Sequence, residues 1–290
     1  ISALGHHVME GRWLHDQNFL DDYVRAWFRD DASRQQLHKY SGWLADALYQ
    51  RYLVISDKKF LTAPLNDLVR DYEQWEHERL TSSGLFWQYD VRDAMEESIS
   101  GSRTNRNLRP TINSYMFGNA RAISLIARLA GNQRLAAEYD SKAAQLRQLV
   151  EDKLWNADAG FFEVLRDNGT FSNAREEIGF IPWYFELPTD NEKFNAAWAQ
   201  FSNPQGFRAP YGITTAERPS PSFRSHGYGH CECDGAVWPF ATSQTLDALA
   251  NVLRNYPQND VSARDYYDAF LTYVESQHAD GKPYIGEYRD

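Results

Sequence analysis

Apolar residues recur at helical spacing through most of the 290-residue chain. A clear stripe runs through residues 33–55, formed by Leu37, Tyr40, Leu44, Leu48 and Tyr52. Such spacing places apolar side chains on one face of a helix. The pattern predicts helices over residues 19–29, 33–55, 60–80, 112–129, 134–154, 176–185, 193–201, 237–255 and 263–276. These nine helices take up far more than the usual third of the residues, so we expect an all-α protein.

The segments between these helices differ in character. Residues 6–16 suggest a loop or the start of a helix, and residues 84–110 have weak periodicity and predict a long functional loop. Residues 155–171 contain an Asn168-Gly169 step between aromatic runs, which predicts a hairpin. Charged helices alternate with helices rich in small or apolar residues, a pattern typical of a two-layer helical ring. Loops at one end of such a ring would converge on a cleft.

Composition limits the kinds of molecule that this protein is expected to bind. Hydrophobic residues make up 42% and charged residues 24%, as in ordinary folded proteins, whereas the aromatic fraction of 14% is high. Aromatic faces stack well on sugar rings. A net charge of −10 argues against a nucleic acid or an anionic membrane as partner. Apolar runs do not approach the length of a membrane span.

The two cysteines, Cys231 and Cys233, are separated by one residue and are poorly placed to bridge each other. They therefore give no disulfide evidence for a compartment. The chain begins at Ile1 rather than Met, consistent with a removed signal or an absent upstream segment. A periplasmic or extracellular location is favoured.

The densest chemistry lies in residues 226–245, which contain His226, His230 and both cysteines. Their spacing does not match common zinc sites, so no metal is predicted. A simpler interpretation is that Asp234 accepts hydrogen bonds from ligand hydroxyls while Trp238 forms a platform. The alternative is that Asp234 lies in a turn and Trp238 in the core.

Two further segments supply carboxyl groups. Residues 85–101 carry acids beside aromatic residues, an environment that can raise a carboxyl pKa toward the value a general acid needs. The acids are Asp90, Asp93, Glu96 and Glu97. Taken alone, such a run is more typical of solvated loop charges. Near the C-terminus, Glu287 lies between Gly286 and Tyr288 and could act as a base if this end is ordered rather than frayed.

Five segments together resemble inverting glycoside hydrolases with an (α/α)6 barrel. They are GLFWQYDVRDAMEESISG (84–101), RPTINSYMFGNARAIS (109–124), IGFIPWYFELP (178–188), CECDGAVWPFATSQTLDALANVL (231–253) and KPYIGEYRD (282–290). The similarity is to family 63, which includes processing α-glucosidases and mannosylglycerate hydrolases, and more distantly to trehalases. It extends loosely to GRWLHD at residues 11–16.

The resemblance implies roles for particular residues. Those enzymes carry the general acid in a segment of the form ESGWDxS, and matching it to residues 93–98 places Glu96 on the acid position. Glu replaces Asp there, so Asp93 and Glu97 remain alternatives. The general base of the family, a Glu in a Gly- and Tyr-rich segment, matches Glu287. Residues 233–239 are similar to the trehalase form QWDxPxGWAP, with Cys where Trp is expected.

The implied reaction is hydrolysis of an oligosaccharide or other glycoside, and it requires no metal or organic cofactor. The acid and base carboxyls of inverting enzymes lie roughly 6.5–9.5 Å apart, leaving room for the attacking water. Residues expected to bind the sugar are Asp234, Arg109, Asn113, Tyr115, Trp87, Trp183, Trp238 and, in a supporting role, His230.

Two alternatives use the same fold. A sugar epimerase or polysaccharide lyase would use His226, His230 and Tyr228 in place of a carboxylate pair. A non-catalytic toroid would only bind glycans. In all cases residues 1–290 are expected to form one (α/α) barrel domain. A full ring of twelve helices usually needs more chain than the pattern supplies here, so we expect an incomplete ring belonging to a longer protein with additional domains.

Overall fold

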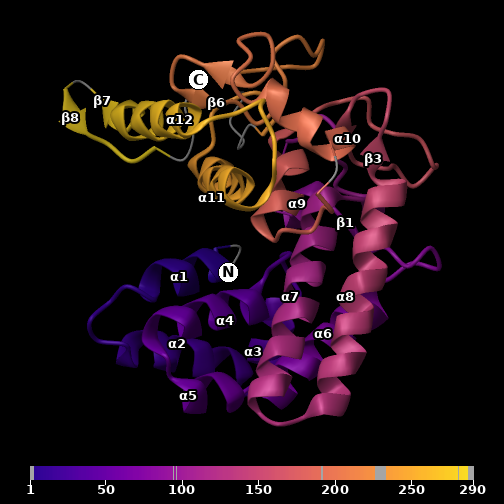
Figure 1. The fold of residues 1–290 in the computed structure, drawn as a ribbon, viewed down its shortest axis with the longest axis vertical. Coiled ribbons are helices and arrows are strands. Elements are labelled where there is room, and N and C mark those ends of the chain that lie inside the picture. Colours follow the sequence, from indigo (N-terminus) through magenta and orange to yellow (C-terminus); the bar gives the residue numbers. More distant parts are fainter. Residues whose placement is uncertain are drawn as a thin grey trace. The chain divides into compact units, whose positions relative to one another are not determined.

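Helices dominate the computed structural model (Figure 1), which describes residues 3–93, 95, 97–190, 192–225, 233–279 and 281–286. The chain divides into two compact units. The first contains residues 1–88, 92–94 and 112–149, and the second contains residues 89–91, 95–111 and 150–290.

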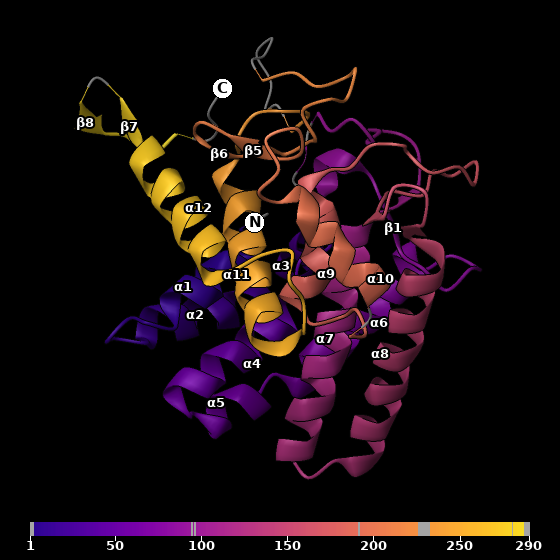
Figure 2. The ribbon, with the colours of Figure 1, turned by 45° about the horizontal axis from the view of Figure 1, so that its top comes forward.

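The described residues of the first unit form helices and one short strand. Its elements are α1 (Leu4–Gly11), α2 (Asn18–Phe28), α3 (Asp31–Leu37), α4 (Leu44–Ile55), α5 (Lys58–Thr62), α6 (Leu65–Arg79), β1 (Trp87–Gln88) and most of α7 (Pro110–Leu129) and α8 (Gln133–Lys153). Helix α1 packs on α4, α2 on α3, and α4 on α5. Helices α7 and α8 lie side by side in both ribbon views (Figures 1 and 2), joined by a turn at Gly131, where φ is 82°.

Two helices expected to be continuous are each divided in two. The helix predicted at 33–55 forms two separate helices, α3 and α4. Asn119 of α7 stabilises the break between them. The Asn119 side chain accepts a hydrogen bond from Ala45 N at 3.0 Å and donates one to Gly42 O at 3.0 Å. The predicted helix at 60–80 is α5 and α6, with Pro64 at the N-cap of α6. Residues 6–16 contain most of α1, so they begin as a helix.

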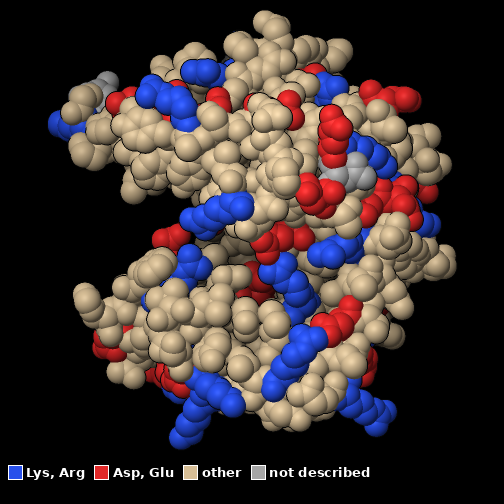
Figure 3. All heavy atoms as spheres, in the orientation of Figure 1, with Lys and Arg blue, Asp and Glu red and all other residues tan. Residues whose placement is uncertain are grey.

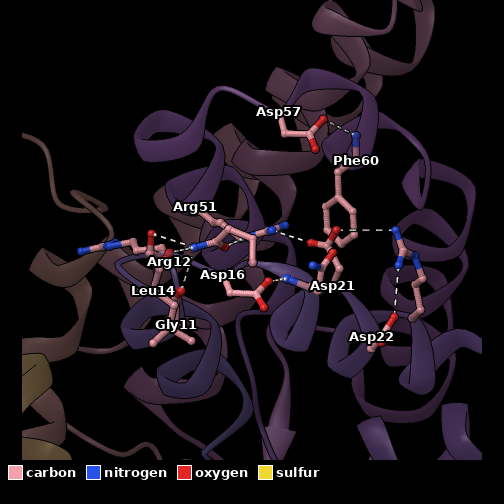
Figure 4. Close-up of polar contacts among 12 residues, drawn as sticks. Gly11, Arg12, Leu14, Asp16, Asp21, Asp22, Arg51, Asp57 and Phe60 are labelled. Atoms are coloured by element: carbon pink, nitrogen blue, oxygen red, sulfur yellow. Dashed lines mark hydrogen bonds and ion pairs between the residues drawn. The ribbon is translucent and has the colours of Figure 1, made fainter.

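A buried arginine ties three helices of this unit together (Figure 4). Arg51 of α4 donates to Asp21 of α2 at 2.5 Å and to Gln17 Oε1 at 3.0 Å. Its guanidinium lies 4.4 Å from the ring centroid of Phe60 on α5. A pocket of about 770 Å³ lies beside this contact, lined by α2, α5 and the start of α6, and its lining contains none of the residues predicted to bind a sugar.

The second unit consists of short elements around two longer helices. They are η1 (Asp90–Arg92, which begins in this unit), β2 (Asn107–Leu108), β3 (Trp155–Asn156), β4 (Phe161–Phe162), η2 (Glu177–Phe180), α9 (Ile181–Tyr184), α10 (Glu192–Asn195), η3 (Ala196–Gln200), β5 (Arg208–Ala209), β6 (Gly212–Ile213), α11 (Pro239–Asn255), α12 (Ala263–Ser276), β7 (His278–Ala279) and β8 (Lys282–Pro283). Helix α11 packs against α9, η2 and α12.

The predicted hairpin at 155–171 is confirmed. Strands β3 and β4 pair antiparallel, with Trp155 opposite Phe162, and the turn between them uses Gly160 at a φ of 59°. A second turn follows, in which Arg166 N donates to Thr170 O at 2.9 Å and Gly169 adopts a φ of 81°. Positive φ favours glycine at both turns.

An aromatic cluster forms the core of this unit. Its fully buried members are Phe161, Phe162, Phe180, Trp183, Trp198 and Phe207. The ring centroids of Phe180 and Trp198 are 4.6 Å apart, and those of Trp183 and Trp198 are 5.6 Å apart at an interplanar angle of 78°. The described residues form twelve α-helices rather than nine, because α1 was not among the predicted helices and those predicted at 33–55 and 60–80 are each divided in two.

Candidate active site

Several residues singled out from the sequence lie outside the described residues. They are Glu96, Glu287, His226, Tyr228, His230 and Cys231. The remaining predicted site residues fall in both units. Asp93, Trp87, Asn113 and Tyr115 belong to the first, and Glu97, Arg109, Trp183, Asp234 and Trp238 belong to the second.

Residues 89–102, here called the acid loop, carry every candidate for the general acid. The main chain closes this loop on itself, because Asp90 N donates to Ser102 O at 3.3 Å and Met95 N donates to Asp90 O at 3.1 Å. Gly101 is required for the closure, since a Cβ atom there would overlap the Asp90 carboxyl and the Ser98 hydroxyl. Asp90 accordingly has a structural role at the base of the loop.

The two described candidates for the acid have different surroundings. Asp93 is buried, with 4% of its surface exposed. The Glu97 side chain is 34% exposed and its carboxylate pairs with Arg103 at 3.0 Å. A general acid must be held in a poorly solvated position. Asp93 has such a position, whereas Glu97 is engaged in an ion pair at the surface.

Arg109 is a fully buried cation among buried carboxyls of the second unit. Burial raises the pKa of Asp90 and of Glu176, and the nearby charge of Arg109 opposes that rise in both cases. Arg109 Nη2 also lies 3.7 Å from Met95 Sδ. Arg109, predicted to hold a sugar hydroxyl, is thus part of the buried support of the acid loop.

The surroundings of Asp234 and Trp238 match the alternative interpretation, in which Asp234 lies in a turn and Trp238 lies in the core. Asp234 lies in a turn before Gly235, and its carboxylate accepts a hydrogen bond from Arg224 at 2.5 Å. Trp238 is buried at the start of α11 and stacks on Phe240 with ring centroids 4.7 Å apart. Contact of either residue with a sugar remains a prediction.

Four other predicted binding residues are also buried. Asn113 accepts a hydrogen bond from Phe86 N at 2.8 Å and donates to Phe86 O at 2.9 Å, so its amide holds the main chain beside Trp87. The Tyr115 ring lies 4.6 Å from that of Trp43, and Trp183 belongs to the aromatic cluster. Trp87 is buried under the guanidinium of Arg79, 4.3 Å from its ring centroid. In this structure the four side chains pack against protein.

Glu176 and Glu177 were not singled out in the sequence, yet both are buried at η2. Burial raises the pKa of Glu177 well above its ordinary value, and the hydroxyls of Thr245 and Thr242 on α11 partly oppose this. The available signal was an acid pair opening an otherwise apolar segment at residues 176–185. Buried carboxyls are uncommon and frequently functional.

Charged side chains of both signs share the surface of the described chain. On the face shown in Figure 3, Lys and Arg side chains are interspersed with Asp and Glu side chains. Within the described ranges, His, Cys, Asp and Glu side chains do not gather in threes or more as a metal site would need. Among the same residues, helices that could span a membrane are absent.

The sequence and the helical fold define this chain as a glycoside hydrolase domain. Residues 2–290 match the mannosylglycerate hydrolase MGH1-like glycoside hydrolase domain, and the chain belongs to this family. A curated relative, an uncharacterized protein of Borreliella burgdorferi, is 23% identical over 215 residues. That match covers 72% of this chain and 44% of the relative, so the chain spans less than half of the relative's length.

Solved structures confirm the fold class. A protein named sialidase is 48% identical with a TM-score of 0.96, and the match covers 99% of this chain and 27% of that one. The family 63 mannosylglycerate hydrolase of Thermus thermophilus is 14% identical with a TM-score of 0.68, over 87% of this chain and 73% of that one. Neutral trehalase from Saccharomyces cerevisiae is 8% identical with a TM-score of 0.62, over 84% and 63%. The predicted all-α (α/α)6-barrel class and the resemblance to family 63 are therefore confirmed.

Proposed function

We propose that this chain is the catalytic domain of a glycosidase that cleaves its substrate with inversion at the anomeric carbon. The match of residues 2–290 to a glycoside hydrolase domain carries this proposal. The acid loop supports it, because a closed loop held by buried charges can present a carboxyl in a fixed position.

In the proposed reaction, an acid from the acid loop protonates the glycosidic oxygen as the bond to the leaving sugar breaks. Glu96 takes this role by its match to the family motif, with Asp93 as the buried alternative. Glu287 removes a proton from the water that attacks the opposite face of the anomeric carbon. Both carboxyls return to their starting protonation states once a proton passes back through solvent.

The substrate class is a glycoside, and the names of the matched proteins point to different members of that class. They name a mannosylglycerate hydrolase, a trehalase and a sialidase. We therefore propose an oligosaccharide or small glycoside and leave its sugar to a screen. Sugar contacts are proposed for Asp234 and Trp238, beside the turn that precedes α11.

The test is a screen of oligosaccharides and aryl glycosides in which NMR follows the anomer released first. We expect release of the anomer opposite in configuration to the substrate bond. Release of the same anomer would contradict inversion. An unsaturated product would instead indicate a lyase, and a change of configuration without cleavage an epimerase.

A further inference from the structure

Glu176 is a buried carboxyl whose hydrogen bonds go to the acid loop. Only 2% of its surface is exposed. Its Oε1 atom accepts hydrogen bonds from Ile99 N at 2.8 Å and from Ser100 N at 3.3 Å. An oxygen that binds two successive amides fixes the orientation of the peptide between them, so Glu176 sets the direction of the chain just after Glu97.

The main chain around Glu176 connects to the other side of the proposed site. Glu176 forms an antiparallel bridge with Ala216, and Glu177 N donates to Thr215 O at 2.8 Å. Thr215 in turn binds the segment after Asp234. Thr215 N donates to Ala236 O at 3.1 Å, and the Thr215 hydroxyl accepts from Gly235 N at 3.0 Å.

A path of hydrogen bonds, joined by the main chain between Glu176 and Glu177, therefore runs from the acid loop to the turn at Asp234. It passes from the amides of Ile99 and Ser100 through Glu176 and then through Thr215 to residues 235–236. All of these residues belong to the second unit. Burial of Glu176 makes the link rigid, because a buried polar group that loses its hydrogen-bond partners is costly.

We propose that Glu176 is a positioning residue that holds the acid loop in register with the turn at Asp234. This inference rests on the proposed function, in which the acid loop supplies the proton and the turn contacts the sugar. Glu176 itself does not touch the substrate. A displacement of about 1 Å in a reacting group can cost about 100-fold in rate. Loss of Glu176 should therefore impair proton donation while the acid itself remains present.

The test compares leaving groups that need a proton with those that do not. For Glu176→Ala, we expect kcat to fall about 100-fold on a substrate with a sugar leaving group. The fall should be far smaller on the dinitrophenyl glycoside of the same sugar, since dinitrophenolate leaves without protonation. Glu176→Gln should retain most activity on both, because its amide oxygen can still accept both hydrogen bonds.

Glu176→Asp is a milder variant, included in case Glu176→Ala does not fold. It keeps the charge beside Arg109 but withdraws the oxygens by one methylene, so we expect a smaller loss with the same dependence on the leaving group. Glu163→Ala is the matched control. Glu163 is equally buried in the second unit, but it holds Asn156 of the β3–β4 hairpin at 3.0 Å. This control should affect both substrates alike.

Hydrogen exchange reports on the link without reference to activity. In Glu176→Ala or Glu176→Asp, a peptide spanning residues 97–101 should exchange faster than in wild type, whereas Glu163→Ala should leave it unchanged. Equal loss on both leaving groups, or unchanged exchange in an active protein, overturns this inference alone. A wild-type protein that cleaves no glycoside of the screen overturns the proposed function, and this inference with it.

Discussion

At the scale of single residues, the acid loop offers three carboxyls for one role. Glu96 matches the family motif, Asp93 is buried, and Glu97 pairs with Arg103 at the surface. Burial favours a position from which a proton can be delivered without competition from water. The ion pair makes Glu97 the weakest of the three.

We expect Glu96→Gln to lower kcat by about 10²–10⁴-fold on a sugar leaving group, because general acid catalysis contributes about that much. Asp93→Asn tests the alternative, and Glu97→Gln serves as the matched control with little change. Steady-state kinetics on the substrate found in the screen measure the three. Retained activity in all three variants, Glu96→Gln, Asp93→Asn and Glu97→Gln, would contradict an acid in this loop.

Glu287→Gln removes the proposed base and should lower kcat by about 10²–10⁴-fold on every leaving group, including dinitrophenolate. The difference from Glu96→Gln arises because activating water is needed whichever group departs. Binding of the substrate, measured by calorimetry, should be retained. A Glu287→Gln protein with normal turnover, combined with an inactive His230→Ala protein, would favour the lyase or epimerase alternative.

At the scale of elements, the sequence was most informative where a helix is defined by its own residues. The helix predicted at 263–276 is α12, whose first turn is fixed by a capping box between Ser262 and Asp265. The break between α3 and α4 was missed because Asn119, distant in sequence, supplies the hydrogen bonds that stabilise it. Tertiary contacts of this kind leave no local pattern.

The same distinction applies to the candidate site. The acid loop and the segment at Asp234 could be found from their composition, since both concentrate acids beside aromatic residues. Glu176 could not, because its role depends on main-chain amides far away in the sequence. The burial of Asn113 and Trp183 could not be predicted either. An aromatic or amide residue occurs both in protein cores and in sugar sites, so its type does not distinguish the two.

Asn119→Ala should destabilise the first unit by about 1–3 kcal/mol, because it leaves the buried amide of Ala45 and the half-buried carbonyl of Gly42 without their partner. Denaturant unfolding measures the change. The exposed Gln133→Ala, at the start of α8, is the control and should stay within about 0.5 kcal/mol of wild type. Equal stability of the two variants would show that Asn119 does not stabilise the break.

At the scale of the whole molecule, burial shifts several carboxyls in the same direction. It raises the pKa of Asp90, Glu163, Glu176 and Glu177. The folded chain therefore keeps protons that the unfolded chain has already released. Their contribution to stability is complete below the ordinary carboxyl pKa and is lost as the pH rises through the raised values, so the part of the free energy of unfolding that these four groups supply should fall with rising pH.

Glu177→Gln tests this dependence, since an amide does not titrate. We expect the variant to gain stability relative to wild type as the pH is raised from about 4.5 toward 8. Urea unfolding across that range gives the difference. The exposed Glu192→Gln should follow the wild type throughout. A constant difference between Glu177→Gln and wild type at every pH would rule out a proton held by Glu177.

The aromatic cluster of the second unit gives the molecule an optical signature. Trp183 and Trp198 are fully buried and cross nearly edge to face, so their transition dipoles lie in a fixed, asymmetric environment. Such a pair gives strong circular dichroism near 280 nm that disappears when tertiary packing is lost. Trp13 of the first unit is 65% exposed and instead emits from a solvent-facing position. Quenching thus reports on the exposed indole of Trp13, whereas the dichroism reports on the packing of buried indoles, which both units contain.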